Sequence, residues 1–105
     1  MLVYLDTTQD HGLLSWGSSN NGEGFHFGID ANDNPILALF GLSNTVGSTT
    51  ASTGQWITAG FTLSSGNTEV YLNGASDATG SQSVNIQDQN HSIGYRRPIG
   101  DLYSD

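Results

Sequence analysis

The stretch Gln55 to Gly74, QWITAGFTLSSGNTEVYLNG, decides the fold because it contains the clearest hairpin pattern in the chain. In its first half, apolar or small residues stand at every second position and so share one face of an extended strand. They are Ile57, Ala59, Phe61 and Leu63. Val70 and Leu72 repeat the alternation after a turn over 64–67, and Asn73-Gly74 offers a second tight turn. A period of two is typical of strands, so the stretch predicts an antiparallel pair.

Outward from this hairpin, short apolar runs predict further strands. The runs span 2–5, 13–17, 25–29, 35–40, 83–86 and 92–95. The polar segments 18–22 and 30–34 are rich in turn residues and join neighbouring strands. Segments 41–54 and 75–80 are predicted to be loops, the first with one short extended piece. No segment carries the apolar spacing of a helix, so we expect an all-β domain.

Composition limits the class of protein. The chain has 105 residues and a mass of 11.1 kDa, enough for a single domain with a core. Apolar residues make up 35% and charged residues only 11%, which favours a two-layer β domain with many turns over a disordered chain. The absence of cysteine excludes disulfides and thiolate metal sites. No run is apolar enough to cross a membrane and the first residues lack a signal-peptide pattern, so the compartment stays undecided.

The charge balance limits the partners. The chain has no lysine, and Arg96 and Arg97 stand against ten acidic residues, for a formal net charge of -8. Nucleic acids and anionic membranes need clustered cations on their protein partners, so both are excluded. Cations, neutral sugars and basic proteins are the compatible partners.

Both ends of the sequence are abrupt. The run 2–5 reads as a strand from the outset, and the tail 100–105 stops where one more strand is expected. Domains normally begin with a few loose residues. We therefore expect a fragment of a longer domain that lacks outer strands, and whether Met1 is a natural start stays open.

The motifs LLSWGSS, GFHFGID, GQW, VYLNG and SIGY follow one another along the chain. This series resembles the laminin-G-like domains of the concanavalin A-like lectin and glucanase superfamily, over nearly the whole chain. In that family the segment around Trp56 commonly runs Gln-Trp-x-His-Val-Ala, and the following strand carries Leu-Tyr-Val-Asn-Gly. Residues 55–56 and 71–74 agree with this pattern, whereas Thr58 stands at the His position and Ala59-Gly60 at the Val-Ala pair.

The resemblance implies an antiparallel jelly-roll β-sandwich that forms one laminin-G-like domain over residues 1–105. Relatives usually carry further strands outside both ends of this segment, so the domain is expected to be shortened. Missing strands would leave backbone groups unpaired along a sheet edge, which invites pairing with another copy. We therefore expect a homo-oligomer joined through exposed edges. Relatives are often extracellular.

The superfamily includes glucanases, so the resemblance raises the possibility of glycoside hydrolysis. Sugar hydrolysis of that type needs two carboxylates held close together, typically at alternate positions of one strand. Glu23 and Glu69 are the only glutamates, they are far apart in sequence, and no Glu-x-Asp-x-x-Glu pattern is present. No serine lies in a nucleophile elbow. The sequence therefore predicts a protein without catalytic activity.

Metal binding centres on the segment 30–34. Asp30 and Asn32 stand at alternate positions as in an EF-hand loop, but Pro35 occupies the required Gly position and Gly41 the required Glu position. A hairpin turn whose side chains bond to their own backbone is favoured instead. Relatives often bind calcium between loops, so calcium stays open as a cofactor. Its candidate ligands are Asp30, Asn32 and Asp101, with Asp6, Asp10, Asp77 and Asp88 unranked. His11, His26 and His91 lack paired spacing, so no zinc site is predicted.

Aromatic and amide side chains carry the remaining functional signal. Sugars are recognised by stacking on Trp or Tyr together with a few hydrogen bonds. Trp16 and Trp56 follow core-like patterns and are predicted to be buried. The candidate ligand-binding residues are Tyr71, Asn73, Tyr95 and Tyr103.

The expected function is a non-catalytic recognition or adhesion module that binds a neutral glycan or a protein partner through loops. The alternative is a structural domain that assembles with itself and takes no small ligand. A relative of the glycoside hydrolases is the third and weakest class.

Overall fold

The computed structural model describes residues 1–6, 11–87, 92–93, 95–96 and 101–102. These residues form eleven strands and no helix. The strands are β1 (Leu2–Tyr4), β2 (His11–Gly17), β3 (Gly24–Ile29), β4 (Pro35–Leu39), β5 (Thr45–Val46), β6 (Trp56–Ser64), β7 (Asn67–Leu72), β8 (Ala75–Ser81), β9 (Ser92–Ile93), β10 (Tyr95–Arg96) and β11 (Asp101–Leu102). The described part therefore contains no helix that could cross a membrane.

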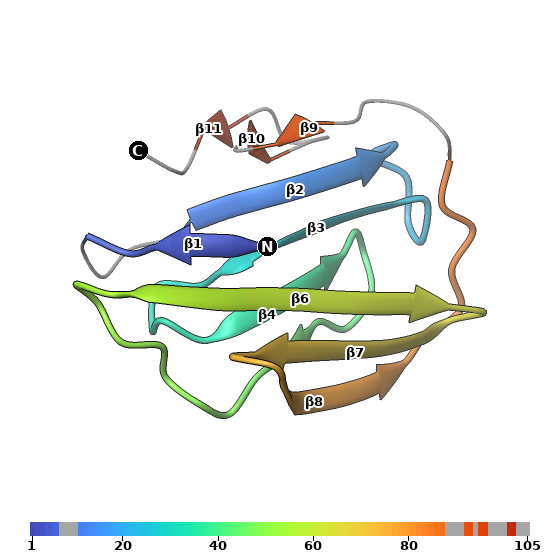
Figure 1. Ribbon diagram of the computed structural model, residues 1–105. Coiled ribbons are helices and arrows are strands. Elements are labelled where there is room, and N and C mark those ends of the chain that lie inside the picture. The colour runs from blue at the N-terminus through green and yellow to red at the C-terminus, as the bar shows by residue number, and fades with distance from the viewer. Residues whose placement is uncertain (7–10, 88–91, 94, 97–100, 103–105) are drawn as a thin grey trace.

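The strands form two main antiparallel sheets. One has four strands in the order β1-β6-β7-β8, and the other has five in the order β5-β4-β3-β2-β9. Strands β10 and β11 pair with each other as a separate ribbon. In Figure 1 the four-stranded sheet lies in front of β2, β3 and β4. The two layers confirm the predicted all-β sandwich.

The central hairpin has the predicted register. Ala59 pairs with Leu72, and Ser64 pairs with Asn67 at the tip. The two turn residues, Ser65 and Gly66, both have positive φ, 51° and 83°. Two successive positive φ values are the signature of the turn that matches the natural twist of a hairpin. Asn73 and Gly74 repeat this geometry with φ of 53° and 81°, so both predicted turns are confirmed.

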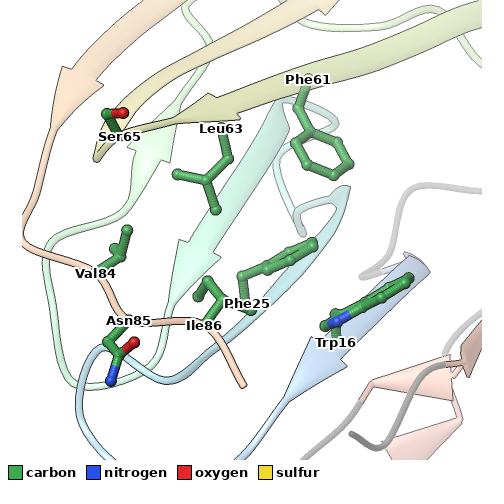
Figure 2. Close-up of a pocket in the computed structure, with 8 residues that line it drawn as sticks. All are labelled: Trp16, Phe25, Phe61, Leu63, Ser65, Val84, Asn85 and Ile86. Carbon is green, nitrogen blue, oxygen red and sulfur yellow. The ribbon is translucent and has the colours of Figure 1, made fainter. Parts of the chain in front are cut away.

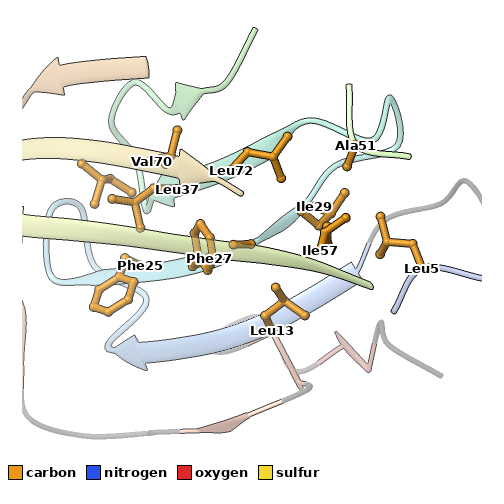
Figure 3. Close-up of a cluster of buried hydrophobic side chains, with 12 residues drawn as sticks. Leu5, Leu13, Phe25, Phe27, Ile29, Leu37, Ala51, Ile57, Val70 and Leu72 are labelled. Carbon is orange, nitrogen blue, oxygen red and sulfur yellow. The ribbon is translucent and has the colours of Figure 1, made fainter. Parts of the chain in front are cut away.

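The core lies between the two sheets (Figure 3). Each strand alternates, and its inward side chains meet those of the opposite sheet. Phe61 of β6 shows this packing, because its ring contacts Phe25 and Phe27 of β3 at centroid distances of 5.3 and 4.9 Å. Burial of a large apolar side chain contributes roughly 1.5–3 kcal/mol. The buried cluster comprises Leu5, Leu13, Phe25, Phe27, Ile29, Leu37, Leu39, Ala51, Ile57, Ala59, Val70 and Leu72.

Two segments differ from the sequence expectation. Residues 75–80 are not a loop: the Asn73-Gly74 turn folds them back onto β7 as strand β8. The predicted strand 83–86 is absent. Asn85 donates its amide to the carbonyl of Gly22 and Gln87 to that of Glu23, so this segment is tied to the β2–β3 turn rather than to a sheet. Val84 and Ile86 still pack against the core, which explains their apolar alternation.

Other predicted strands are confirmed with shifted ends. The extended piece expected within 41–54 is β5, and the run 92–95 is divided between β9 and β10. The turn 30–34 is an Asx turn as expected, because Oδ1 of Asp30 accepts the backbone amides of Asn32 and Asn34, both at 2.9 Å. The loss of outer strands stays a prediction.

Candidate functional site

The four-stranded sheet has one face on the core and one face outside the sandwich. We call the outer one the open face. Strand alternation and pairing assign its residues, because side chains that share a register position share a face. Its members are Leu2, Tyr4, Trp56, Thr58, Gly60, Thr62, Ser64, Asn67, Glu69, Tyr71, Ser76, Thr79 and Ser81. Hydroxyl and amide groups dominate the set, and Glu69 is its one carboxylate.

Trp56 is strongly exposed, at 64%. The prediction that it is buried is wrong. Ile57 and Ala59 point into the core, so strand alternation turns Trp56 outward onto the open face. Its ring lies against that of Tyr4, which is 45% exposed, with centroids 5.4 Å apart and planes at 65°. Trp16, also predicted to be buried, is half-buried against the core.

A hollow lies over Gly60, four residues along β6 from Trp56. Its volume is about 350 Å³, and its walls include Thr58, Thr62 and Tyr71. A side-chain carbon placed on Gly60 would meet no atom within 4 Å, so the missing side chain leaves free space above the backbone. The amino group of Met1, at the same hollow, donates to the carbonyl oxygen of Ala59 at 2.6 Å.

Glu69 occupies the middle of β7 and is held by two hydroxyl groups. The Tyr71 hydroxyl donates to Oε1 at 2.8 Å, and the Ser76 hydroxyl of β8 donates to Oε2. Hydrogen bonds to the charged form favour it. The Ser76 and Tyr71 hydroxyls therefore lower the pKa of the Glu69 carboxyl, while its partial burial acts in the opposite direction. The same bond to Glu69 raises the pKa of Tyr71.

The structure brings together some of the predicted ligand-binding residues. Tyr71 lies on the open face, and Asn73 follows in the adjoining turn, where its Oδ1 accepts the amide of Thr58 at 3.1 Å. Tyr95 belongs to β10 and pairs with Leu102, in the ribbon outside the four-stranded sheet. Tyr103 lies outside the described residues. Sequence reasoning missed Trp56, Tyr4 and Glu69.

The candidate metal ligands do not gather into a site. Asp30 and Asn32 share the Asx turn, and Asp101 pairs with Arg96 in the ribbon. Asp77 accepts hydrogen bonds from the amide and hydroxyl of Thr49, at 3.0 and 2.6 Å. Within the described ranges, no three acidic or histidine side chains are grouped so that they could hold a metal ion. Asp10 and Asp88 lie outside those ranges. Calcium binding stays a prediction.

A second cavity opens between the sheets (Figure 2). Its volume is about 510 Å³, and it is walled by Trp16, Phe25, Phe61, Leu63, Ser65, Val84, Asn85 and Ile86. Most of its lining residues are apolar, while Ser65 and Asn85 contribute polar side chains. The open face carries more hydroxyl groups, among them those of Thr58, Thr62 and Tyr71. The open face is therefore the better candidate for recognising a polar ligand.

The two glutamates lie on different elements. Glu23 is in the β2–β3 turn, where it accepts hydrogen bonds from the Ser18 hydroxyl and the Asn20 side-chain amide at 2.8 and 3.1 Å. Glu69 is on β7, in the other sheet. The two therefore do not occupy alternate positions of one strand, as the glycosidase arrangement requires.

The chain forms a two-sheet sandwich with an exposed aromatic pair on one face. The profile of the laminin G family, in the concanavalin A-like lectin/glucanases superfamily, matches residues 2–103, and the chain belongs to this family. No curated protein matches the chain. Membership confirms the resemblance and supports a binding module at the level of the family, whose domains generally bind glycans or proteins and are typically non-catalytic.

Proposed function

We propose that this chain is a non-catalytic recognition module that binds a neutral glycan on the open face. The observation that carries the proposal is the exposure of Trp56 and its edge-to-face contact with Tyr4. A large apolar ring left in water is a common mark of a binding surface. The pair is held by the pairing of β1 with β6, so the rings are positioned before a ligand arrives.

The groups around the rings match the chemistry of a sugar. One face of a pyranose ring is apolar and stacks on an aromatic ring, while its hydroxyls need donors and acceptors at the rim. Thr58, Thr62 and Tyr71 supply hydroxyls around the hollow over Gly60, further along the same sheet from Trp56. A glycan chain that stacks on Trp56 and runs along β6 would therefore meet these polar groups.

The charge of this face disfavours anionic ligands. Strands β1, β6, β7 and β8 carry no lysine, arginine or histidine. Sulfated and carboxylated glycans are normally held by Arg or Lys, so this face lacks their usual partners. Glu69 and the net charge of -8 add repulsion.

The proposal moves the contact from the loops to the sheet, and it keeps Tyr71 and the adjoining Asn73 from the expected ligand-binding residues. A protein partner stays the other candidate within the same class. Self-assembly through sheet edges is a separate prediction, and glycoside hydrolysis gets no support from the two glutamates, which lie on different elements.

Retention on immobilised neutral polysaccharides tests the proposal. Wild type is compared with Trp56→Ala, and Ile93→Ala is the control because Ile93 is 76% exposed on β9 of the other sheet. We expect at least one neutral polysaccharide to retain wild type and the control, and Trp56→Ala to bind about tenfold more weakly, or ~1.4 kcal/mol. Equal thermal melting would show that all variants fold. Equal retention of Trp56→Ala, or no retention by any neutral polysaccharide, would overturn the proposal.

A further inference from the structure

Glu69 borders a second hollow of the four-stranded sheet. This hollow has a volume of about 360 Å³ and is lined by Thr62, Ser64, Asn67, Thr68, Glu69, Thr79 and Gly80. Every lining residue except Glu69 is uncharged. The hollow is therefore a polar site with a single negative charge on its wall.

The Glu69 carboxylate is oriented and still has acceptor capacity. A carboxylate offers about four lone-pair positions on its two oxygens. The Tyr71 hydroxyl takes one position on Oε1, and the Ser76 hydroxyl takes one on Oε2. These two bonds come from β7 and β8, so they fix the carboxylate from two strands. About one acceptor position on each oxygen is left for a ligand.

No positive group of the surrounding strands compensates this charge. Strands β6, β7 and β8 carry no lysine, arginine or histidine, and their other carboxylate, Asp77, is bonded to Thr49. Arg96 is in β10, which pairs with β11 in the separate ribbon. An oriented carboxylate among neutral hydroxyls favours a ligand that brings its own positive charge, because charge-assisted hydrogen bonds are about twice as strong as neutral ones.

We propose, on the basis of the glycan-binding function above, that the hollow beside Glu69 is a subsite for the ammonium group of an amino sugar. The same glycan chain stacks on Trp56 at the other end of β6. Glu69 pairs with Thr62, which is six residues along the strand from Trp56. At ~3.3 Å per residue the two sites are roughly 20 Å apart, a span for an extended oligosaccharide rather than a single sugar.

The surroundings favour an amino sugar over the side chain of a basic peptide. Thr62, Ser64 and Thr79 place hydroxyls around the carboxylate, and Asn67 adds an amide. A lysine side chain would bring an aliphatic stem that cannot form hydrogen bonds with these groups. A sugar ring brings several hydroxyls beside its ammonium group and can pair with them.

Two oligosaccharides that differ only at nitrogen test this assignment. Chitosan oligosaccharide carries free amines, and chitin oligosaccharide of the same length carries neutral acetamides. We expect wild type to bind the amine form about tenfold more tightly at a pH where the amine is charged. Glu69→Gln should abolish this preference, so that the amine and acetylated forms bind with similar affinity. Glu23→Gln is the control, because Glu23 is a similarly hydrogen-bonded carboxylate in the β2–β3 turn, away from the open face.

The possible outcomes separate this inference from the proposed function. Two results together support both the proposed function and the subsite. Trp56→Ala loses binding to both oligosaccharides, and only Glu69→Gln abolishes the preference for the amine form. A wild type that binds neutral glycans without preferring the amine overturns the subsite alone, as does a preference that survives in Glu69→Gln. A lysine-rich peptide that binds more tightly than chitosan oligosaccharide also overturns it. Failure to bind any neutral glycan overturns the proposed function itself.

Discussion

Thr45 and Thr68 bring two hydroxyl groups together inside the sandwich. Their Oγ1 atoms lie 2.6 Å apart, and the residues are 4% and 2% exposed. Replacing Thr68 by Val keeps the shape but removes one partner of this buried hydrogen bond. Because an unsatisfied buried hydroxyl costs about 1–3 kcal/mol, we expect Thr68→Val to lower the free energy of unfolding by that amount in a denaturant titration.

The double variant Thr45→Val with Thr68→Val is the control for this prediction. Replacing both partners by apolar groups of the same shape is close to neutral. The double variant should therefore recover most of the stability lost in Thr68→Val. A double variant that is no more stable than the single one would contradict the cost assigned to the unpaired hydroxyl.

The two glutamates predict how stability depends on pH. Hydrogen bonds lower the pKa of both carboxyls in the folded chain, chiefly from Ser18 for Glu23 and from Ser76 for Glu69. The unfolded chain then binds protons more readily in acid. This stabilisation is fully present above the ordinary carboxyl pKa and is lost as the pH falls through the lowered folded pKa.

Thermal melting across acidic pH checks that expectation. When the pH is lowered from neutral to acidic, the double variant Glu23→Gln with Glu69→Gln should lose less stability than wild type. Identical acid profiles for the two proteins would contradict the assigned hydrogen bonds.

At the residue scale, the sequence predicts Tyr71 as a ligand-binding residue but gives no such signal for Glu69. A catalytic pair would have two carboxylates at alternate positions, and Glu69 has no such neighbour. Its partner Ser76 comes from another strand, β8, which sequence reasoning did not predict. The carboxylate is recognisable as a site only when the pairing of β7 with β8 is known.

At the element scale, two glycines of the central hairpin have opposite requirements. Gly66 has a φ of 83°, and a side-chain carbon there would lie 2.1 Å from the carbonyl oxygen of Gln82. Gly60 has no such clash. We expect Gly66→Ala to lower the free energy of unfolding by more than 1 kcal/mol, since both strain and overlap act against it.

Gly60→Ala is the matched comparison in the same hairpin. Its melting temperature should stay close to that of wild type, while the added methyl group enters the hollow of the open face. Weaker glycan binding with unchanged stability is the expected result. Equal destabilisation of the two variants would contradict the difference in backbone geometry.

Elements with a clear apolar period were predictable, and those without one were not. The β6–β7 hairpin follows from alternation and two turn sequences, and the structure reproduces both. Strand β8 has no large apolar side chains, so its sequence reads as a loop until the Asn73-Gly74 turn places it beside β7. Trp56 begins β6 next to Ile57, so the two side chains point to opposite faces of the sheet, and the alternation of β6 itself indicates that Trp56 faces outward.

At the scale of the whole molecule, the unpaired edges of the four-stranded sheet are surfaces through which copies of the chain could associate. In the described part, β1 and β8 form the two edges of the four-stranded sheet. Strand β1 also exposes Leu2 at 63% and Tyr4 at 45%. Edge strands that expose apolar side chains pair readily with other chains. We propose that copies associate through β1, against the repulsion of a net charge of -8.

Light scattering over a concentration series checks self-association. We expect the mean mass to rise with protein concentration and to rise further with added salt, because salt screens the repulsion between acidic copies. Replacing Leu2 by Lys should reduce association, since charged side chains protect sheet edges. A constant monomer mass at every concentration and salt level would contradict the edge-pairing proposal.

The central claim is that Trp56 contacts a neutral glycan, and its own fluorescence tests this most directly. The chain has two tryptophans, so Trp16→Phe leaves Trp56 as the single reporter and keeps an aromatic ring in the cavity between the sheets. A neutral polysaccharide that retains the protein should shift the Trp56 emission and protect the ring from a soluble quencher, because the sugar covers it. Retention with unchanged Trp56 emission and quenching would contradict the claim and place the contact elsewhere on the molecule.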